Sequence, residues 1–358
     1  MRALLDDYDR ITTGGVPVGR AVVLSVWGSA PRPEGSSLIA TADGRFAGSV
    51  SGGCVETTAV QEIGAVLADG VPRVVSYGVT NERAWEVGLA CGGTIRVFVE
   101  PVVPELALKS ARAQVGSVVV TVIGGAPGSD RTDAALTGRS VRVLEDGSQE
   151  GGAEDRWLGD TARSTALAAL ERERTTTAVI TAPSGNSIEV LLEVYPRPPR
   201  LLIFGATPVA QAMVPMAKAL GYFTCVADGR EAFLVPERFP DADRLLRAWP
   251  EEAFREMGLD RGTCVCVLSH DPKFDEPALD MALRSPARYV GAIGSRQTQA
   301  GRRERLRKAG FSSEEVARLH GPIGLDLGGR SAAETALAIL AEMTMTRYGA
   351  AGLRTGRA

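Results

Sequence analysis

The sequence contains few histidines and few cysteines, and each shortage excludes a class of protein. The 358 residues include two histidines, His270 and His320, which excludes a metal site built mainly from imidazole groups. Five cysteines is an odd number in a long chain, which favours reduced thiols in the cytoplasm over a disulfide framework. We therefore expect a cytoplasmic protein without a histidine-rich metal centre.

Long apolar runs and excess charge are also absent. No stretch approaches the ~20 apolar residues that span a bilayer, and residues 1–10 carry acids where a signal peptide would be apolar. The net charge of −3 gives no electrostatic reason to bind nucleic acid or an anionic membrane. Apolar residues make up 44% and charged residues 23%, as in ordinary globular proteins, and 358 residues favour two or three domains.

What the sequence does contain is a pair of glycine–cysteine loops in its first third. Residues 28–56 end in Gly52, Gly53, Cys54 and Glu56, directly before a helical pattern over residues 55–68. The second loop follows about 35 residues later and consists of Cys91, Gly92 and Gly93 after Leu89 and Ala90. We expect the two loops to form one site.

The chemistry of such loops favours a soft, anionic ligand. Consecutive glycines allow an anion to approach the backbone, and a helix N-terminus offers unpaired amides and partial positive charge. A cysteine there is shifted toward the thiolate, which suits a soft metal centre or sulfur transfer. Alternatively, Cys54 is a small buried residue, and Glu56 either acts as a general base or only complements the helix dipole.

A degenerate internal repeat separates the two thiols from a second, thiol-free copy. Residues 118–128 echo residues 22–32 at an offset of 96, which predicts copies over about 16–101 and 115–196. Ala153 stands where Cys54 stands, and Ser184 stands where Cys91 stands. The first copy is therefore the expected working copy.

A proline-rich linker at residues 196–200 predicts a domain boundary. We expect a mixed α/β domain over 1–197 and a second domain over 198–358. Short apolar runs alternate with helical patterns in the second domain, which predicts a Rossmann-like, doubly wound parallel sheet. Ligands bind such sheets beyond the carboxyl ends of the strands, where Gly205, Asp228, His270, Gly294 and Arg296 are expected.

These residues suggest an alternative function as an NAD(P)-dependent oxidoreductase using Gly205, Asp228 and His270, with His270 and Asp271 as an acid–base pair. The glycine fingerprint is incomplete, because Thr207 replaces the glycine beside the pyrophosphate and Pro208 removes an amide. A dinucleotide is therefore doubtful here.

Two further alternatives concern the second domain. A thiol–disulfide protein is disfavoured because Cys264 and Cys266 are expected to point to opposite faces of a strand. A basic helix over residues 296–309 is expected to be a solvated face, with a docking surface for an acidic partner as the other interpretation.

Taken together, the motifs resemble the XdhC/CoxI family, maturation factors of molybdenum hydroxylases such as xanthine dehydrogenase. The resemblance leaves only about residues 103–196 unassigned. It is carried by GSAPRPEGSSLIATADGRFAGSVSGGCVE, GLACGGTIRVFVEP, LLIFGATPVAQA with VADGREAF, VLSHDPKFDEPAL, YVGAIGSRQTQAGRRERL and GPIGLDLGGRSAAETALAILAEM.

The resemblance implies a protein that binds molybdenum cofactor, assists its sulfuration and inserts it into an apo molybdenum hydroxylase. The chain lacks an iron–sulfur cysteine array and is too short to be the hydroxylase itself, so we expect a carrier rather than an enzyme. Cys54 and Cys91 are the expected contacts to molybdenum, a cysteine desulfurase is a further expected partner, and a homodimer is compatible with this role. The family's motifs in the second domain fall on His270, Asp271, Gly294, Ser295, Arg296, Gly324 and Asp326.

Overall fold

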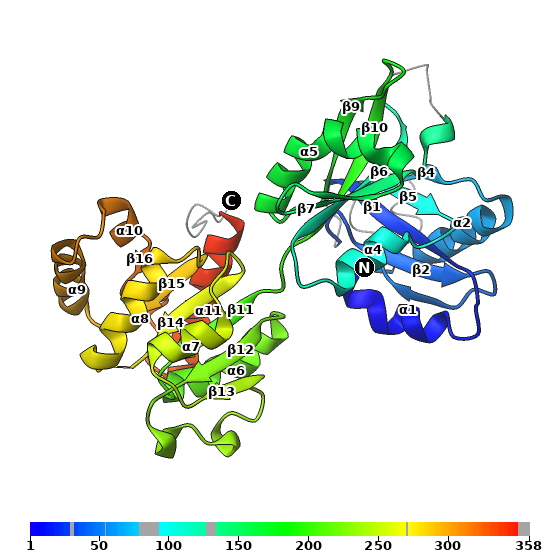
Figure 1. Cartoon of the computed structure of the whole chain (residues 1–358). Helices are drawn as coiled ribbons and strands as arrows, with labels where there is room; N and C mark the ends of the chain where they lie inside the picture. Colours follow the sequence, from blue (N-terminus) through cyan, green and yellow to red (C-terminus); the bar gives the residue numbers. More distant parts are fainter. Residues whose placement is uncertain (29–31, 54, 79–92, 127–133, 270, 350–358) are drawn as a thin grey trace. The chain divides into compact units, whose positions relative to one another are not determined.

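The computed structural model describes residues 1–28, 32–53, 55–78, 93–126, 134–269 and 271–349. The chain divides into two compact units, Met1–Arg197 and Pro198–Ala358. Figure 1 shows both units, each of which is described by itself. Across these described ranges, no helix is both long and apolar enough to cross a membrane.

The first unit contains two five-stranded antiparallel sheets with the same strand order. One sheet has the order β3-β2-β1-β5-β4 and the other has the order β8-β7-β6-β10-β9. The strands of the first sheet are β1 (Val18–Gly28), β2 (Ser37–Thr41), β3 (Phe46–Gly48), β4 (Arg73–Gly78) and β5 (Gly93–Glu100), with α2 (Glu56–Asp69) between β3 and β4. Those of the second are β6 (Ser117–Gly125), β7 (Ser140–Leu144), β8 (Gln149–Gly151), β9 (Thr176–Thr181) and β10 (Ser187–Tyr195), with α5 (Arg156–Glu171) between β8 and β9.

The registers of the two sheets are related by one offset. Val22 pairs with Phe98 in the first sheet, and Val118 pairs with Val194 in the second. Both partners therefore shift by 96 residues, from 22 to 118 and from 98 to 194. A duplicated fold gives this relation, because strand pairing and strand order are inherited together.

Apolar contacts and buried ion pairs join the two sheets. Val22, Leu24 and Phe98 of the first sheet form one buried cluster with Ile123 and Leu191 of the second. On their other faces, α2 and α5 cover the first and second sheets respectively.

Arg20 on β1 is fully buried between the two sheets. It donates to Glu100 of its own sheet at 2.7 Å and to Glu193 of the other sheet at 3.0 Å. Arg96 on β5 makes a second cross-sheet pair, donating to both carboxylate oxygens of Glu189. Because each pair is held by hydrogen bonds of 2.7–3.0 Å, the pairs constrain the relative position of the two sheets.

The second unit is a six-stranded parallel sheet with helices on both faces, which confirms the predicted Rossmann-like fold. The strand order β13-β12-β11-β14-β15-β16 reverses between β11 and β14. The strands are β11 (Arg200–Phe204), β12 (Phe223–Ala227), β13 (Arg244–Leu246), β14 (Thr263–Val267), β15 (Tyr289–Ala292) and β16 (Leu319–His320). The helices are α6 (Pro208–Ala219), α7 (Pro250–Met257), α8 (Pro272–Arg284), α9 (Arg296–Lys308), α10 (Ser313–Ala317) and α11 (Ala332–Tyr348).

Some elements were not predicted from the sequence. Helices α1 (Leu5–Ile11) and α4 (Glu105–Arg112) pack with Val119 and Tyr195 in a separate apolar cluster of the first unit. Short 3-10 helices occupy η1 (Arg2–Leu4), η2 (Ala134–Leu136), η3 (Ala153–Asp155), η4 (Glu231–Phe233) and η5 (Pro236–Arg238).

The expectation for Cys264 and Cys266 was wrong. Both side chains lie in the same apolar cluster, on one face of β14, whereas Val265 lies in the cluster on the other face. The reason is the period of two along a strand, which places residues i and i+2 on the same side. Both thiols are buried, so neither is open to disulfide exchange with a partner.

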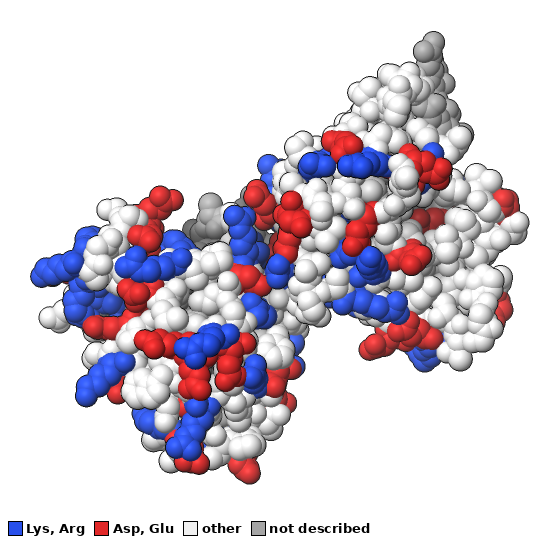
Figure 2. All heavy atoms as spheres, viewed as in Figure 1, with Lys and Arg blue, Asp and Glu red and all other residues white. Residues whose placement is uncertain are grey.

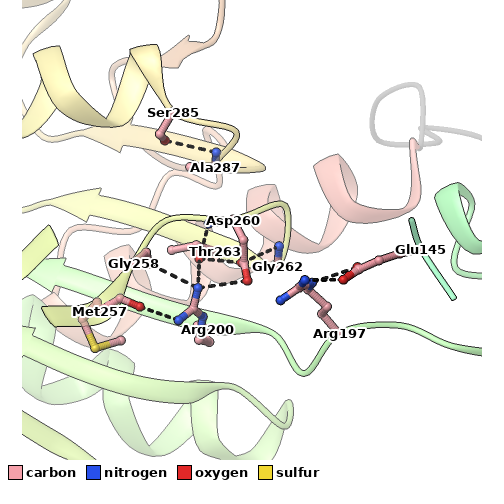
Figure 3. Close-up of polar contacts among 10 residues, drawn as sticks. All are labelled: Glu145, Arg197, Arg200, Met257, Gly258, Asp260, Gly262, Thr263, Ser285 and Ala287. Carbon is pink, nitrogen blue, oxygen red and sulfur yellow. Dashed lines mark hydrogen bonds and ion pairs between the residues drawn. The ribbon is translucent and has the colours of Figure 1, made fainter. Parts of the chain in front are cut away.

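Each end of the linker is attached to its own unit. Arg197 pairs with Glu145 of the first unit, as Figure 3 shows. Arg200 donates to the carbonyl oxygens of Met257 and Gly258 and to the hydroxyl of Thr263, all in the second unit. Pro198 and Pro199 lie between these two arginines.

Candidate functional site

The topology of the first sheet brings the glycine-rich segments toward one end. Gly28 at the end of β1 pairs with Gly93 at the start of β5, and Gly78 at the end of β4 pairs with Thr94. Strands β1 and β3 are both antiparallel to β2, so residues 49–53 leave β3 toward that same end. Cys91 and Gly92 directly precede Gly93, but they and Cys54 lie outside the described residues.

The carboxylate of Glu56 organises the loop before α2. Its two oxygens accept at least seven hydrogen bonds from residues 49–55. The backbone donors are the amides of Val50 (3.2 Å), Ser51 (2.9 Å), Gly52 (3.0 Å), Gly53 (2.8 Å) and Val55 (3.2 Å). The hydroxyl donors are those of Ser49 (2.6 Å) and Ser51 (2.7 Å). The loop is thus folded around an anion that belongs to the chain itself.

These hydrogen bonds decide the ionisation of Glu56. The side chain is only 8% exposed, and burial alone would raise its pKa. The hydrogen bonds from Ser49 and Ser51 outweigh burial and lower the pKa of Glu56 to about 2. A saturated carboxylate with so low a pKa is a poor proton acceptor, so the geometry does not favour the general-base role.

The arrangement also changes the expected role of the glycine amides. An anionic ligand was expected to accept from the amides around Gly52 and Gly53, but both amides donate to Glu56. The positive φ of Gly52 (87°) and Gly53 (131°) explains why glycine is needed there, since other residues rarely adopt such angles. Their conformational freedom serves the internal carboxylate.

The second copy lacks this arrangement. Aligning Ala153 with Cys54 places Asp155 at the position of Glu56. Asp155 lies 2.5 Å from the guanidinium of Arg139 and is the N-cap residue of α5. Only the copy with the thiols has the carboxylate-centred loop.

Sequence reasoning missed Trp27, which lies at the same end of the first sheet. It is the penultimate residue of β1 and pairs with Thr94, the second residue of β5. Its side chain is 76% exposed, more than any other large apolar residue in the described ranges. The available signal was an aromatic residue at the end of a β-branched run, directly before a glycine loop.

In the second unit, Gly205 and Asp228 follow the carboxyl ends of neighbouring strands. Gly205 has a φ of 105°, and a Cβ atom there would lie 2.7 Å from the amide nitrogen of Ser269. Asp228 is buried and accepts from the amide of Ala206 at 2.8 Å and from both the amide and the guanidinium of Arg230. Burial opposes ionisation, but these hydrogen bonds lower the pKa of Asp228.

This turn is filled by its own side chains and backbone. Asp228 accepts four hydrogen bonds, so its oxygens are already used where a ribose diol would donate. The hydroxyl of Thr207 accepts from the amide of Ala210, and Pro208 lacks an amide hydrogen. The geometry therefore gives the oxidoreductase alternative no support.

The remaining predicted residues of this unit act mostly as structural caps. Ser295 caps α9 through the amide of Thr298, and Asp271 caps α8 through that of Lys273. Gly294 has a φ of 139° beside Thr298. His270 lies outside the described residues.

Gly324 and Asp326 lie in the loop after β16, and Arg296 is the first residue of α9. The amide of Gly324 donates to Glu342 of α11, which also accepts from Tyr289. Arg296 and Asp326 are both highly exposed and 3.9 Å apart. An exposed pair at that distance contributes little to stability.

The basic helix α9 has a mixed-charge surface. Arg305 pairs with Glu276 and Lys308 with Glu304, while Arg302 is buried against Asp275. Figure 2 shows acidic and basic side chains interspersed on the visible face of this unit. The geometry supports the interpretation of α9 as a solvated face over that of a docking surface for an acidic partner.

A groove of about 370 Å³ lies between α8 and α9, and its lining contains none of the predicted site residues. Within the part of the chain that the structure describes, no group of three or more His, Cys, Asp or Glu side chains could hold a metal ion. The expected molybdenum contacts, Cys54 and Cys91, fall outside that part.

Known protein families match part of each unit. A family model described as the XdhC Rossmann domain matches residues 201–343, and one described as the XdhC and CoxI family matches residues 12–78. The chain is 28% identical over 352 residues to the molybdenum cofactor insertion chaperone PaoD of Escherichia coli, covering 96% of this chain and 90% of that protein.

Two further similarities cover almost the whole chain. A protein of Bacillus subtilis named as a probable xanthine dehydrogenase subunit is 26% identical over 351 residues, covering 96% of each chain. The crystal structure of a xanthine dehydrogenase from Bacillus halodurans has a TM-score of 0.70 at 22% identity and covers 98% of this chain and 97% of that one. The latter similarity establishes a shared fold.

Proposed function

Because the chain belongs to the XdhC and CoxI family, we propose that it is an insertion chaperone for molybdenum cofactor. It binds the cofactor and delivers it to an apo molybdenum hydroxylase of the xanthine dehydrogenase type. A relative that aligns over 96% of the chain bears the name of such a chaperone, which supports the proposal.

The observation that carries the proposal is the carboxylate-centred loop of residues 49–55. It exists in the copy that has Cys54 and not in the copy that has Ala153. Since Glu56 satisfies the loop's amides from within, the loop keeps its shape without cargo. We assign Glu56 to this supporting role, Cys54 and Cys91 to contact with the metal or the incoming sulfur, and Gly92 and Gly93 to close approach of the cargo.

Sulfuration of the cofactor before delivery, with a cysteine desulfurase as the sulfur source, is the finer part of the proposal. A cysteine thiol is the group that accepts and passes on sulfur, and Cys54 lies two residues before the start of α2. The hydroxylase, the desulfurase and a homodimer remain proposed partners.

The test is cofactor retention. The chain and its Cys54→Ser and Cys91→Ser variants are purified from a cofactor-producing host, and molybdenum and pterin are measured per chain. The proposal expects cofactor in the unmodified chain, loss in either variant, and retention in the control Cys225→Ala, whose thiol is buried in the second unit. An unmodified chain without molybdenum and pterin refutes the carrier function.

A delivery assay tests the second half of the proposal. Loaded chain is mixed with an apo molybdenum hydroxylase and hydroxylase activity is followed. We expect loaded chain, but not unloaded chain, to activate the hydroxylase. Free cofactor at the same concentration should activate it more slowly. Equal activation by free cofactor would remove the insertion role.

A further inference from the structure

The most exposed large apolar side chain of the described residues lies beside the proposed cargo site, and its surroundings suggest a purpose. Trp27 is 76% exposed at the end of β1, where Gly28 pairs with Gly93. An indole ring combines a large flat apolar face with a polar N–H, so a tryptophan that is 76% exposed at a strand end is suited to stack on a flat, partly polar ligand.

The direction of the Trp27 ring follows from the strand. Val26 packs with α2 in the cluster on one face of the sheet, so Trp27 points to the other face. Thr94 pairs directly with Trp27 and Gly78 pairs directly with Thr94, so all three lie on that face. They form a strip across three strands about 10 Å wide, in which Gly78 has no side chain.

Residues further from the sheet end close the strip on one side. Arg96 lies two residues beyond Thr94 on β5, on the same face, and is fixed by its two hydrogen bonds to Glu189 of the second sheet. The strip thus combines an exposed aromatic ring, a hydroxyl and an open glycine position, next to a fixed arginine–glutamate pair.

The repeat provides an internal comparison. In the matched segments 22–32 and 118–128, Trp27 corresponds to Ile123. Ile123 is 3% exposed and lies in the apolar cluster between the sheets. The copy with both cysteines therefore exposes a large aromatic ring where the copy without them buries an aliphatic side chain.

From this placement we propose that Trp27 is the stacking platform for the pterin ring of the cargo. A pterin is a flat heteroaromatic ring with hydrogen-bonding edges, which suits an indole face bordered by the Thr94 hydroxyl. The inference rests on the proposed carrier function and assigns the pterin to the Trp27 strip, separately from the metal contacts assigned to the cysteines.

The experiment measures binding of two probes to the full chain: molybdenum cofactor, and pterin-6-carboxylate, which has no metal and no dithiolene. Stacking of a base on an aromatic side chain is worth about 1–3 kcal/mol, or roughly 5- to 150-fold in Kd. We expect Trp27→Ala to weaken both probes within that range, and Trp27→Phe to stay within a few-fold of the unmodified chain.

The control is Phe46→Ala, which removes another exposed ring, 52% exposed, from the same sheet. Phe46 lies toward the opposite end, since it pairs with Ala40, which pairs with Gly19. We expect unchanged binding for this variant and unchanged thermal unfolding for both, because neither ring is buried.

The outcomes separate the two proposals. Unchanged affinity of Trp27→Ala for both probes overturns the stacking role and leaves the carrier function intact. Pterin binding that depends on Trp27, in a chain that never retains molybdenum cofactor, supports the platform and refutes the carrier function. An unmodified chain that binds neither probe overturns both.

Discussion

Replacing Glu56 with glutamine removes the charge around which residues 49–55 are folded. Glutamine offers one acceptor oxygen, and its amide group is a donor that faces other donors. Several backbone amides that now bind the carboxylate would lose their partner, and an unsatisfied buried donor costs about 1–3 kcal/mol.

The pKa of Glu56 gives an independent magnitude. The pKa falls from 4.5 to about 2, and each unit corresponds to about 1.4 kcal/mol, so the ionised carboxylate stabilises the fold by on the order of 3 kcal/mol. Because the folded-state pKa is the lower one, this stabilisation is present above pH 4.5 and is lost as the pH falls toward 2.

The assay is urea unfolding of the unmodified chain and of Glu56→Gln at pH values from 7 down to 2.5, in which the free energy of unfolding of the first unit is measured. We expect a gap of about 2–3 kcal/mol at pH 7 that narrows below about pH 4.5. Glu62→Gln, on the same helix and 4.0 Å from Arg73, is the control and should change stability by less than about 0.5 kcal/mol. A gap under 0.5 kcal/mol at pH 7, or one independent of pH, would refute the reasoning.

Three further predictions test other parts of the structure. Burial outweighs the attraction of Arg20 and raises the pKa of Glu100 to about 7, so the stability that protonated Glu100 gives the fold is present below pH 4.5 and is lost as the pH rises through 7. In urea titrations between pH 5 and 8, the unfolding free energy of Glu100→Gln should therefore rise relative to that of the unmodified chain. Two curves of unfolding free energy against pH that run parallel would contradict this. Gly205→Ala should lower the unfolding free energy by about 2 kcal/mol more than Gly221→Ala, because both have positive φ but only the first Cβ would meet the backbone of Ser269; equal losses in calorimetry would rule out the clash. Titration calorimetry with NAD(H) and NADP(H) at about 1 mM should detect no binding, since the oxygens of Asp228 are already occupied, and a saturable signal would restore the oxidoreductase alternative.

Much of the fold could be predicted because it is encoded in local patterns. The alternation of strands and helices after residue 200 predicted the doubly wound sheet, and Ser331 and Glu334, three residues apart, form a capping box at the start of α11. Strands β13 and β16 were missed because three and two residues are too short to show a period. Helix α4 was missed because its eight residues make little more than two helical turns, too few to show a clear period.

The candidate site could be located but not described in detail. The glycines before α2 and their place before a helix were readable, yet the carboxylate that turns back onto them depends on a side-chain conformation that no spacing encodes. The exposure of Trp27 likewise depends on which strands pair beside it. An apolar run in the sequence predicts burial, and a residue that departs from that rule is visible only in three dimensions.

The residues of the linker make their hydrogen bonds within one unit or the other. Pro196 accepts a hydrogen bond from Arg2 of the first unit, and Pro199 accepts one from Phe223 of the second. Arg197 and Arg200 are likewise bound within their own units. A break at Pro198 would sever none of these contacts, so each unit would keep them if the two units were produced as separate chains.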